Sequence, residues 1–219
     1  MNIQSVIDKL FRRDPKMKPN LCYSQNGEDL LLNRLLENKK EGFFIDVGCY
    51  HPIHRNNTFL LYKKGWKGIN IDIHSFSIDL FNYIRTKDLN YNFAVSDKNE
   101  SLNMYYQKEL SQLSTIEYEQ AKKVFQGPIK EKKIQALTLN EILKKSKIEK
   151  KIDLLDIDVE GADLKVLQSL SFDKYKPELI CVEIHEKSIK ESKTFKFLDS
   201  YNYELIWSGV FSHIFRSKS

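Results

Sequence analysis

Carboxylates that close short apolar runs are the side chains of this 219-residue chain best placed to do chemistry. Asp46 and Gly48 follow the apolar run at residues 43–45, and Asp72 ends a second run at residues 68–71. In a strand-helix-strand unit, a glycine turn lets the backbone approach a ligand, and an acid closing the next strand binds ribose hydroxyls. Asp46, Gly48 and Asp72 are therefore predicted to hold a nucleoside cofactor.

The turn that begins at Asp46 lacks the glycines of a dinucleotide-binding loop. Such a loop crowds backbone amides around a pyrophosphate, whereas Gly48 is followed by the bulky Tyr50 and His51. S-adenosylmethionine has no phosphate. Its sulfonium and ammonium tolerate Asp46, and its ribose offers two hydroxyls to Asp72. The turn therefore favours S-adenosylmethionine, and the alternative is an ordinary buried strand that ends in a capping acid and a turn glycine.

A second group of polar side chains stands in and after two later apolar runs. Asp156 and Asp158 alternate with apolar residues, so their side chains share one face of a strand, and Glu160 follows at the next turn. Glu183 and His185 repeat the alternation in the last of these runs. Ligands of open parallel sheets lie at the carboxyl ends of the strands, so these residues are predicted to border one pocket. The alternative is that the carboxylates cap helices or pair with lysines.

Methyl transfer from a sulfonium to a hydroxyl needs aligned reactants and a group that takes the hydroxyl proton. His185 and His51 are the predicted bases and Asp158 is the carboxylate alternative, while a structural role for either histidine stays open. A divalent cation is a further alternative that is not favoured, because its only signal is an Asp-x-Asp-x-Glu spacing. Its ligands would come from Asp156, Asp158, Glu160 and His185.

The elements that would position these residues alternate between strands and helices. Strands are predicted at residues 43–47, 67–72, 91–95, 152–158 and 179–185, with helices near 57–64, 76–86 and 161–169. This alternation is typical of βαβ units and a parallel sheet, so the fold class is α/β. Runs at 203–207 and 212–216 flank a Ser-Gly pair and predict a hairpin.

Between the third and fourth of these strands the chain makes a polar excursion. Residues 106–130 are predicted to form a lid or substrate loop, with a helix at 117–125. Residues 133–137 predict a short strand, and Thr138 with Glu141 predicts a helix start.

The first twenty residues are predicted to form an amphipathic helix and a linker. The apolar positions recur at helical spacing in a segment that ends near Pro15: Ile3, Val6, Ile7, Leu10 and Phe11. Residues 21–219 are predicted to form a single domain, because the chain is too short for two comfortable ones.

Four blocks of the chain resemble a known family. They are Tyr-Ser-Gln-Asn-Gly-Glu-Asp at 23–29, the stretch from Asp46 to Asp72, Leu-Thr-Leu-Asn-Glu-Ile-Leu at 137–143, and the acidic stretch at 153–163. In order and spacing they resemble the FkbM-type S-adenosylmethionine-dependent methyltransferases. The resemblance implies a Rossmann-like class I methyltransferase fold, with a mostly parallel seven-stranded sheet, helices on both faces and a C-terminal antiparallel hairpin.

The resemblance also extends the expected cofactor site. Through it, Gln25 and Glu28 are expected at the methionine end of the cofactor, together with Asn57 and Thr58, whose place at a helix N-terminus suits a carboxylate. The end of the third strand is expected at the adenine edge. The full expected set is Gln25, Glu28, Asp46, Gly48, Asn57, Thr58, Asp72, Asn92, Ala94 and Asp156.

Composition excludes several classes of protein. The net charge of +5 comes partly from lysine runs, but no nucleic-acid-binding motif accompanies them. No apolar stretch approaches the roughly 20 residues of a membrane helix, and no signal peptide is visible, so a cytoplasmic protein without stable membrane insertion is expected. Cys22, Cys49 and Cys181 lack the spacing of a zinc site and are predicted to be buried thiols.

Sugar O-methylation is the activity that the resemblance implies. The expected acceptor is a nucleotide-activated or glycan-linked sugar destined for a surface polysaccharide. Methylation of a small non-sugar metabolite and a non-catalytic S-adenosylmethionine-binding module are the alternatives. A homo-oligomer stays open.

Overall fold

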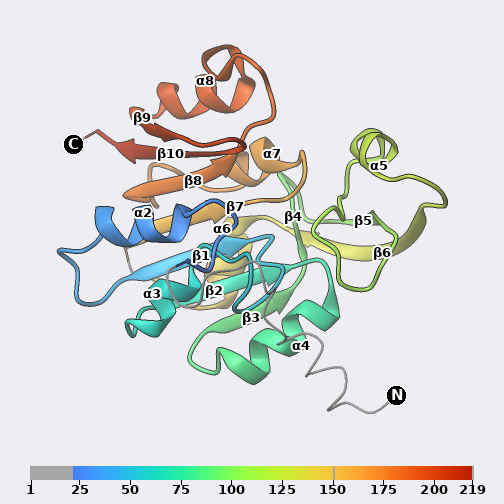
Figure 1. Ribbon diagram of the computed structural model, residues 1–219, viewed down its shortest axis with the longest axis horizontal. Coiled ribbons are helices and arrows are strands. Elements are labelled where there is room, and N and C mark those ends of the chain that lie inside the picture. The colour runs from blue at the N-terminus through green and yellow to red at the C-terminus, as the bar shows by residue number, and fades with distance from the viewer. Residues whose placement is uncertain (1–21, 150, 219) are drawn as a thin grey trace.

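A seven-stranded sheet forms the centre of the computed structural model, which describes residues 22–149 and 151–218 (Figure 1). The strand order is β3-β2-β1-β7-β8-β10-β9. The strands are β1 (Phe43–Val47), β2 (Lys67–Asp72), β3 (Leu89–Asn92), β7 (Leu154–Ile157), β8 (Leu179–Glu183), β9 (Tyr203–Ser208) and β10 (Ser212–Ser217). The helix predicted within residues 1–20 lies outside the described residues.

Strand direction agrees with the sequence prediction. The first five strands in that order pair in parallel, and β10 pairs antiparallel with both β8 and β9. All five residues of β1 are buried, which is the pattern of a central strand covered on both faces. The predicted α/β class, the seven-stranded sheet and the C-terminal hairpin are confirmed.

Helices cover both faces of the sheet. On one face, Phe44 of β1 packs in a cluster with residues of α2 (Glu28–Leu35) and α3 (Phe59–Lys63). On the other, Ile45 packs in a larger cluster with residues of α6 (Leu139–Lys145), α7 (Asp163–Gln168) and α8 (Lys193–Ser200). Alternate residues of one strand thus feed two cores, as the two-residue period of a strand requires.

The remaining helices are short or lie at the edge of the sheet. Helix α4 (Ser75–Ile84) connects β2 to β3, and a 3-10 turn, η1 (Ile189–Glu191), precedes α8. The predicted helix start at Thr138 is present, because its hydroxyl accepts the backbone N–H of Glu141 at 3.2 Å. None of the described helices is both long enough and apolar enough to cross a bilayer.

A second sheet corrects the prediction of one strand at 91–95. That segment divides into β3 in the large sheet and β4 (Ala94–Val95) in a three-stranded sheet of order β4-β6-β5. Strands β5 (Glu100–Tyr106) and β6 (Lys130–Leu137) pair antiparallel, and their pairing draws the chain away from the large sheet. The excursion between them carries α5 (Tyr118–Val124) and stands to one side of the main sheet in Figure 1.

Candidate functional site

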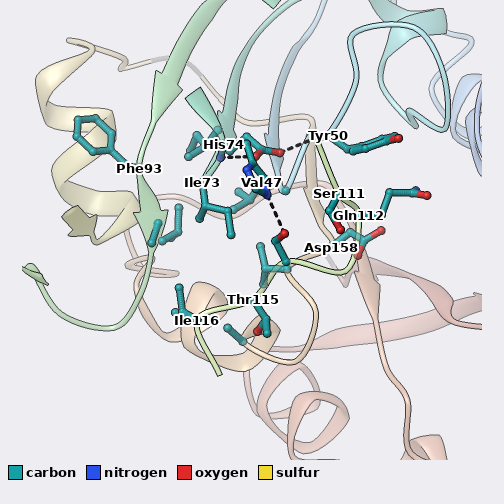
Figure 2. A pocket seen from close by; sticks show the side chains of 18 residues that line it. Val47, Tyr50, Ile73, His74, Phe93, Ser111, Gln112, Thr115, Ile116 and Asp158 are labelled. Atoms are coloured by element: carbon teal, nitrogen blue, oxygen red, sulfur yellow. Dashed lines mark hydrogen bonds between the residues drawn. The ribbon is translucent and has the colours of Figure 1, made fainter. Parts of the chain in front are cut away.

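Two adjoining pockets lie at the carboxyl ends of β1, β2 and β7. We call the first the apolar pocket; it encloses about 500 Å³ and is shown in Figure 2. Its lining combines aliphatic, aromatic and polar residues and comprises Val47, Gly48, Tyr50, Ile71, Asp72, Ile73, His74, Phe93, Ala94, Val95, Ser111, Gln112, Ser114, Thr115, Ile116, Asp158, Val159 and Ala162.

The second, which we call the acidic pocket, also encloses about 500 Å³. Its lining comprises Gln25, Asn26, Glu28, Asp46, Gly48, Cys49, Arg55, Asn56, Asn57, Gln112, Asp156, Asp158, Glu183, Phe211 and Ser212. Gly48, Gln112 and Asp158 line both pockets, so the two adjoin at these residues, and we call them together the cleft.

Gly48 allows the cleft to form because two strand ends touch there. It has a φ of 83°, and a Cβ atom at this position would lie 1.8 Å from the carbonyl oxygen of Asp158. The backbone N–H of Asp158 donates to the carbonyl of Val47 at 2.9 Å, which holds the end of β7 against the turn after β1. Any side chain at Gly48 would therefore push the two strand ends apart.

Asp72 offers acceptor atoms to the apolar pocket. Its two carboxylate oxygens accept the backbone N–H groups of Tyr50 at 2.8 Å and His74 at 2.7 Å. Burial raises the pKa of Asp72 to about 6, although these two hydrogen bonds act in the opposite direction. A carboxylate held in this way can still accept hydrogen bonds from neighbouring hydroxyls.

The remainder of the apolar pocket, which we call the slot, is bordered by apolar side chains such as Ile73 and Ile116. Phe93 also lines the pocket, but its ring is turned away from these side chains in Figure 2. Ala94 lines the slot, whereas Asn92 does not line either pocket. The side-chain amide of Asn92 instead donates to the carbonyl of Asp72 at 2.9 Å.

The excursion between β5 and β6 forms one wall of the apolar pocket. The hydroxyl of Thr115 donates to the carbonyl of Glu160 at 2.9 Å, and Nε2 of His74 lies 2.7 Å from the hydroxyl of Ser114. These bonds fasten the segment at 111–116 to the ends of β7 and β2. The segment lies within the predicted lid or substrate loop, although no role in the site was predicted for its individual residues.

The acidic pocket concentrates negative charge. Burial, and then the charge of Asp46, raise the pKa of Asp156 to about 8. Asp158 is accessible to solvent within the cleft although protein atoms surround it. The protein atoms that surround Asp158, and then the charges of Glu183 and Glu160, raise its pKa well above the ordinary value. Such a cluster attracts a positively charged ligand, which lowers the repulsion among the carboxylates.

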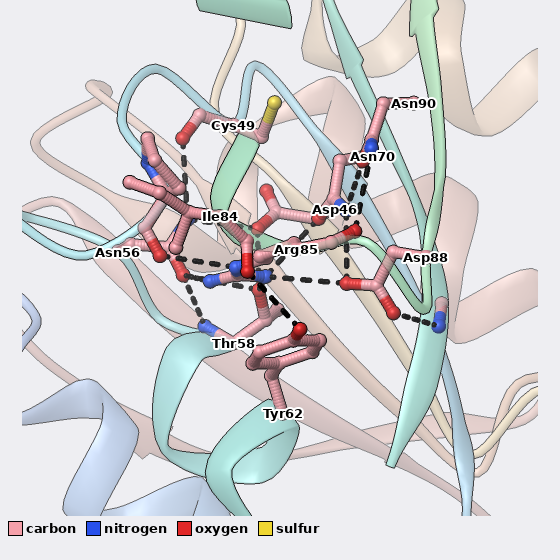
Figure 3. A network of polar contacts seen from close by, with 12 residues as sticks. Asp46, Cys49, Asn56, Thr58, Tyr62, Asn70, Ile84, Arg85, Asp88 and Asn90 are labelled. Atoms are coloured by element: carbon pink, nitrogen blue, oxygen red, sulfur yellow. Dashed lines mark hydrogen bonds and ion pairs between the residues drawn. The ribbon is translucent and has the colours of Figure 1, made fainter. Parts of the chain in front are cut away.

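A buried arginine supports the floor of the acidic pocket, and sequence reasoning missed it. Arg85 has no exposed surface and donates to the hydroxyl of Thr58 at 2.8 Å, to the carbonyl of Pro52 at 3.0 Å and to the side chain of Asn56 (Figure 3). Thr58 and Asn56 in turn donate to the carboxylate of Asp46 at 2.6 and 3.0 Å. Arg85 therefore fixes Asp46 through two intermediaries.

Little in the sequence points to Arg85, because it follows α4 like an ordinary surface residue. In the structure its guanidinium lies 4.9 to 5.9 Å from the centres of four aromatic rings and 3.8 Å from the carboxylate of Asp88. The rings are those of Phe44, Phe59, Tyr62 and Phe81. Thr58, expected to contact the cofactor, belongs to this network and does not line the cleft.

The two histidines expected to act as a base lie away from the centre of the cleft. Nδ1 of His51 accepts the backbone N–H groups of Ile53 and His54 at 3.1 and 3.0 Å, and burial lowers the pKa of His51 to about 3. His51 lines neither pocket, so the structure gives it the position of a turn-holding residue.

His185 lies beyond the end of β8. Its Nε2 is 2.9 Å from Oε2 of Glu183, and this contact raises the pKa of His185. Glu183 lines the acidic pocket, whereas His185 lines a neighbouring cavity. His185 therefore reaches the cleft only through Glu183.

Three ligand atoms of metal-binding type meet at this edge of the cleft. Within the described part of the chain, Glu160, Glu183 and His185 bring one such atom each within 4.8 Å of the others. Two of these residues belong to the alternative cation site considered from the sequence. Asp156 and Asp158, the other two residues of that site, face the acidic pocket instead.

The sheet order, the glycine turn after β1, the acid that ends β2 and the antiparallel β10 together define a Rossmann-like methyltransferase. Residues 46–205 match the model of the methyltransferase FkbM domain, and the chain belongs to that family. No match to the chain is found among curated proteins.

Proposed function

We propose that this protein is an S-adenosylmethionine-dependent methyltransferase that acts on a hydroxyl of a sugar. The observation that carries the proposal is the pair of adjoining pockets, in which an apolar slot with an acid at its edge lies beside an acidic pocket. The adenine belongs in the slot, the ribose hydroxyls on Asp72, and the methionine end in the acidic pocket.

Charge supports this placement of the cofactor. The methyl donor carries a positive sulfonium and a positive ammonium at the end that would enter the acidic pocket. Five carboxylates line that pocket: Glu28, Asp46, Asp156, Asp158 and Glu183. After transfer the sulfur is neutral, so attraction to the pocket weakens and the product is easier to release.

Asp158 is the residue best placed to take the acceptor proton. It lines both pockets, and so lies where the sulfur end of a cofactor and an acceptor would meet. The positive sulfonium would favour the ionised form of Asp158, and because the pKa of Asp158 is raised, that carboxylate has a higher proton affinity than an ordinary aspartate has. As the acceptor oxygen bonds to the methyl carbon and the carbon–sulfur bond breaks, the hydroxyl proton passes to Asp158.

A sugar acceptor fits the composition of the acidic pocket. Sugars present hydroxyl edges and apolar C–H faces. The carboxylates accept hydrogen bonds from hydroxyls, and Phe211, which is 44% exposed at the pocket lining, offers a ring face for stacking. A phosphate of a nucleotide-activated sugar would lie outside the acidic pocket, where it avoids repulsion by the carboxylates.

Calorimetry followed by a transfer assay tests the proposal. We expect S-adenosylmethionine and S-adenosylhomocysteine to bind, and labelled methyl to pass to one or more members of a panel of nucleotide sugars and oligosaccharides. Binding without transfer to any sugar would favour a non-catalytic module or a non-sugar metabolite as the acceptor. The proposal would be refuted if neither S-adenosylmethionine nor S-adenosylhomocysteine bound.

A further inference from the structure

Arg55 is the one basic side chain in the described lining of the acidic pocket. It has a φ of 51°, in the left-handed region, and it immediately precedes two asparagines that bond to the pocket floor. Asn56 donates to Asp46 at 3.0 Å and Asn57 donates to Asp156 at 3.1 Å. The chain is therefore held in place immediately after Arg55.

The guanidinium of Arg55 lies where the two pockets join. It donates to the side-chain oxygen of Gln112, a residue that lines both pockets. Among the described carboxylates, none forms an ion pair with Arg55 within 4.0 Å. A guanidinium has five N–H donors, so most of its donors and its full charge are available to a ligand.

A ligand with an amino-acid end needs such a group here. Its α-carboxylate would enter a pocket lined by five carboxylates and would be repelled without a nearby cation. The two residues expected to bind that carboxylate already have other partners. The backbone N–H of Thr58 donates to Asn56 at 3.0 Å, and the side-chain amide of Asn57 donates to Asp156 at 3.1 Å. Helix α3 that follows has only five residues and makes a weak anion site.

We infer that Arg55 binds the α-carboxylate of the methionine end of the cofactor, while Gln112 holds the guanidinium in place. The inference rests on the proposed function, since it assumes that the cofactor is S-adenosylmethionine. Arg55 thereby separates the two charges of the amino-acid end: the carboxylate on the arginine and the ammonium on the acids opposite.

Two ligands that differ at the amino-acid end test the inference by calorimetry. S-adenosylhomocysteine has the carboxylate, whereas 5′-deoxy-5′-methylthioadenosine has the same nucleoside and a sulfur but no amino acid. We expect Arg55→Gln to weaken binding of S-adenosylhomocysteine roughly 10- to 100-fold, because a charge-assisted hydrogen bond is lost. The affinity for 5′-deoxy-5′-methylthioadenosine should change by less than about 2-fold. Arg55→Lys should recover part of the loss.

A matched control removes the same charge elsewhere. Arg34 is exposed in the last turn of α2 and lines neither pocket, so Arg34→Gln should leave both affinities unchanged. Equal losses for both ligands in Arg55→Gln would overturn the inference in favour of a structural role. Unchanged binding of S-adenosylhomocysteine would also overturn the inference. If the KM for the acceptor then rose in Arg55→Gln, Arg55 would be assigned to an anionic group of the acceptor.

Failure of the proposed function gives a different result. In that event the wild-type protein binds neither ligand, and the assignment of Arg55 falls with it. If the wild type binds both ligands and Arg55→Gln loses affinity only for S-adenosylhomocysteine, both the proposed function and the role of Arg55 are supported.

Discussion

Tyr50 donates its backbone N–H to Oδ2 of Asp72 across 2.8 Å, and this bond joins the turn after β1 to the end of β2. The bond holds the Asp72 carboxylate at the edge of the apolar pocket in one orientation. Because each carboxylate oxygen has two acceptor positions, one backbone donor on each leaves room for two hydroxyls of a ligand.

Asp72→Ala should weaken binding of S-adenosylmethionine by about 1 to 3 kcal/mol, because the ribose hydroxyls would lose their acceptors. Calorimetry measures the change. Asp79 is exposed on α4 and lines neither pocket, so Asp79→Ala serves as the matched control. Equal affinities in the wild type and Asp72→Ala would remove Asp72 from the cofactor site.

Asp156 should make stability fall as pH rises. Its folded-state pKa is about 8 against an ordinary 3.8, so between these values the folded state binds more protons than the unfolded state. The stabilisation is complete below the unfolded pKa and is lost as pH rises through the folded pKa. In urea unfolding, the free energy of unfolding should fall less between pH 5 and pH 8 in Asp156→Asn than in the wild type, by at least about 1 kcal/mol. An equal fall in the two proteins would mean that Asp156 ionises normally.

Arg85→Met should destabilise the fold by about 3 to 5 kcal/mol, because it leaves the buried carboxylates of Asp46 and Asp88 without their cation. Urea unfolding gives the value. In the double variant Arg85→Met with Asp88→Asn we expect part of the stability to return. A loss below about 1 kcal/mol in the single variant would show that the network does not support the cleft.

Asp158→Asn should lower kcat by on the order of 100-fold or more, while the Kd for S-adenosylhomocysteine changes little. His185→Gln should lower kcat only a few-fold, because His185 reaches the cleft only through its contact with Glu183. His51→Gln should lower the melting temperature rather than the rate, since His51 holds a turn. The opposite ranking of Asp158 and His185 would transfer the role of base to the histidine.

Methyl transfer should survive dialysis against a chelator, because the base proposed here is a carboxylate. The control is addition of Mg²⁺ or Mn²⁺ to the dialysed protein, which should not raise kcat. Loss of activity on dialysis with recovery on adding metal would instead assign a cation to Glu160, Glu183 and His185. Substitution of Glu160 by Gln would then abolish the recovery.

Short-range patterns in the sequence predicted most strands of the large sheet, and the family resemblance supplied its seven-stranded arrangement. Strand β1 is an apolar run that ends at an acid and a glycine, and the hairpin of β9 and β10 is two runs around a Ser-Gly pair. The division of the segment 91–95 between two sheets was not predictable, because β4 and β6 pair across about 40 residues of chain. Nothing local to Ala94 indicates which sheet it joins.

The sequence by itself determined which acids and which glycine stand at strand ends, because alternation and turn glycines are local patterns. The residues predicted in this way that line the cleft are Asp46, Gly48, Asp72, Asp156 and Asp158. Only the tertiary structure decided which side chains complete it. Arg55, Gln112 and the buried Arg85 come from loops and a helix end whose contacts lie far along the chain. Their roles depend on burial and on neighbours in space, and no periodicity in the sequence encodes either one.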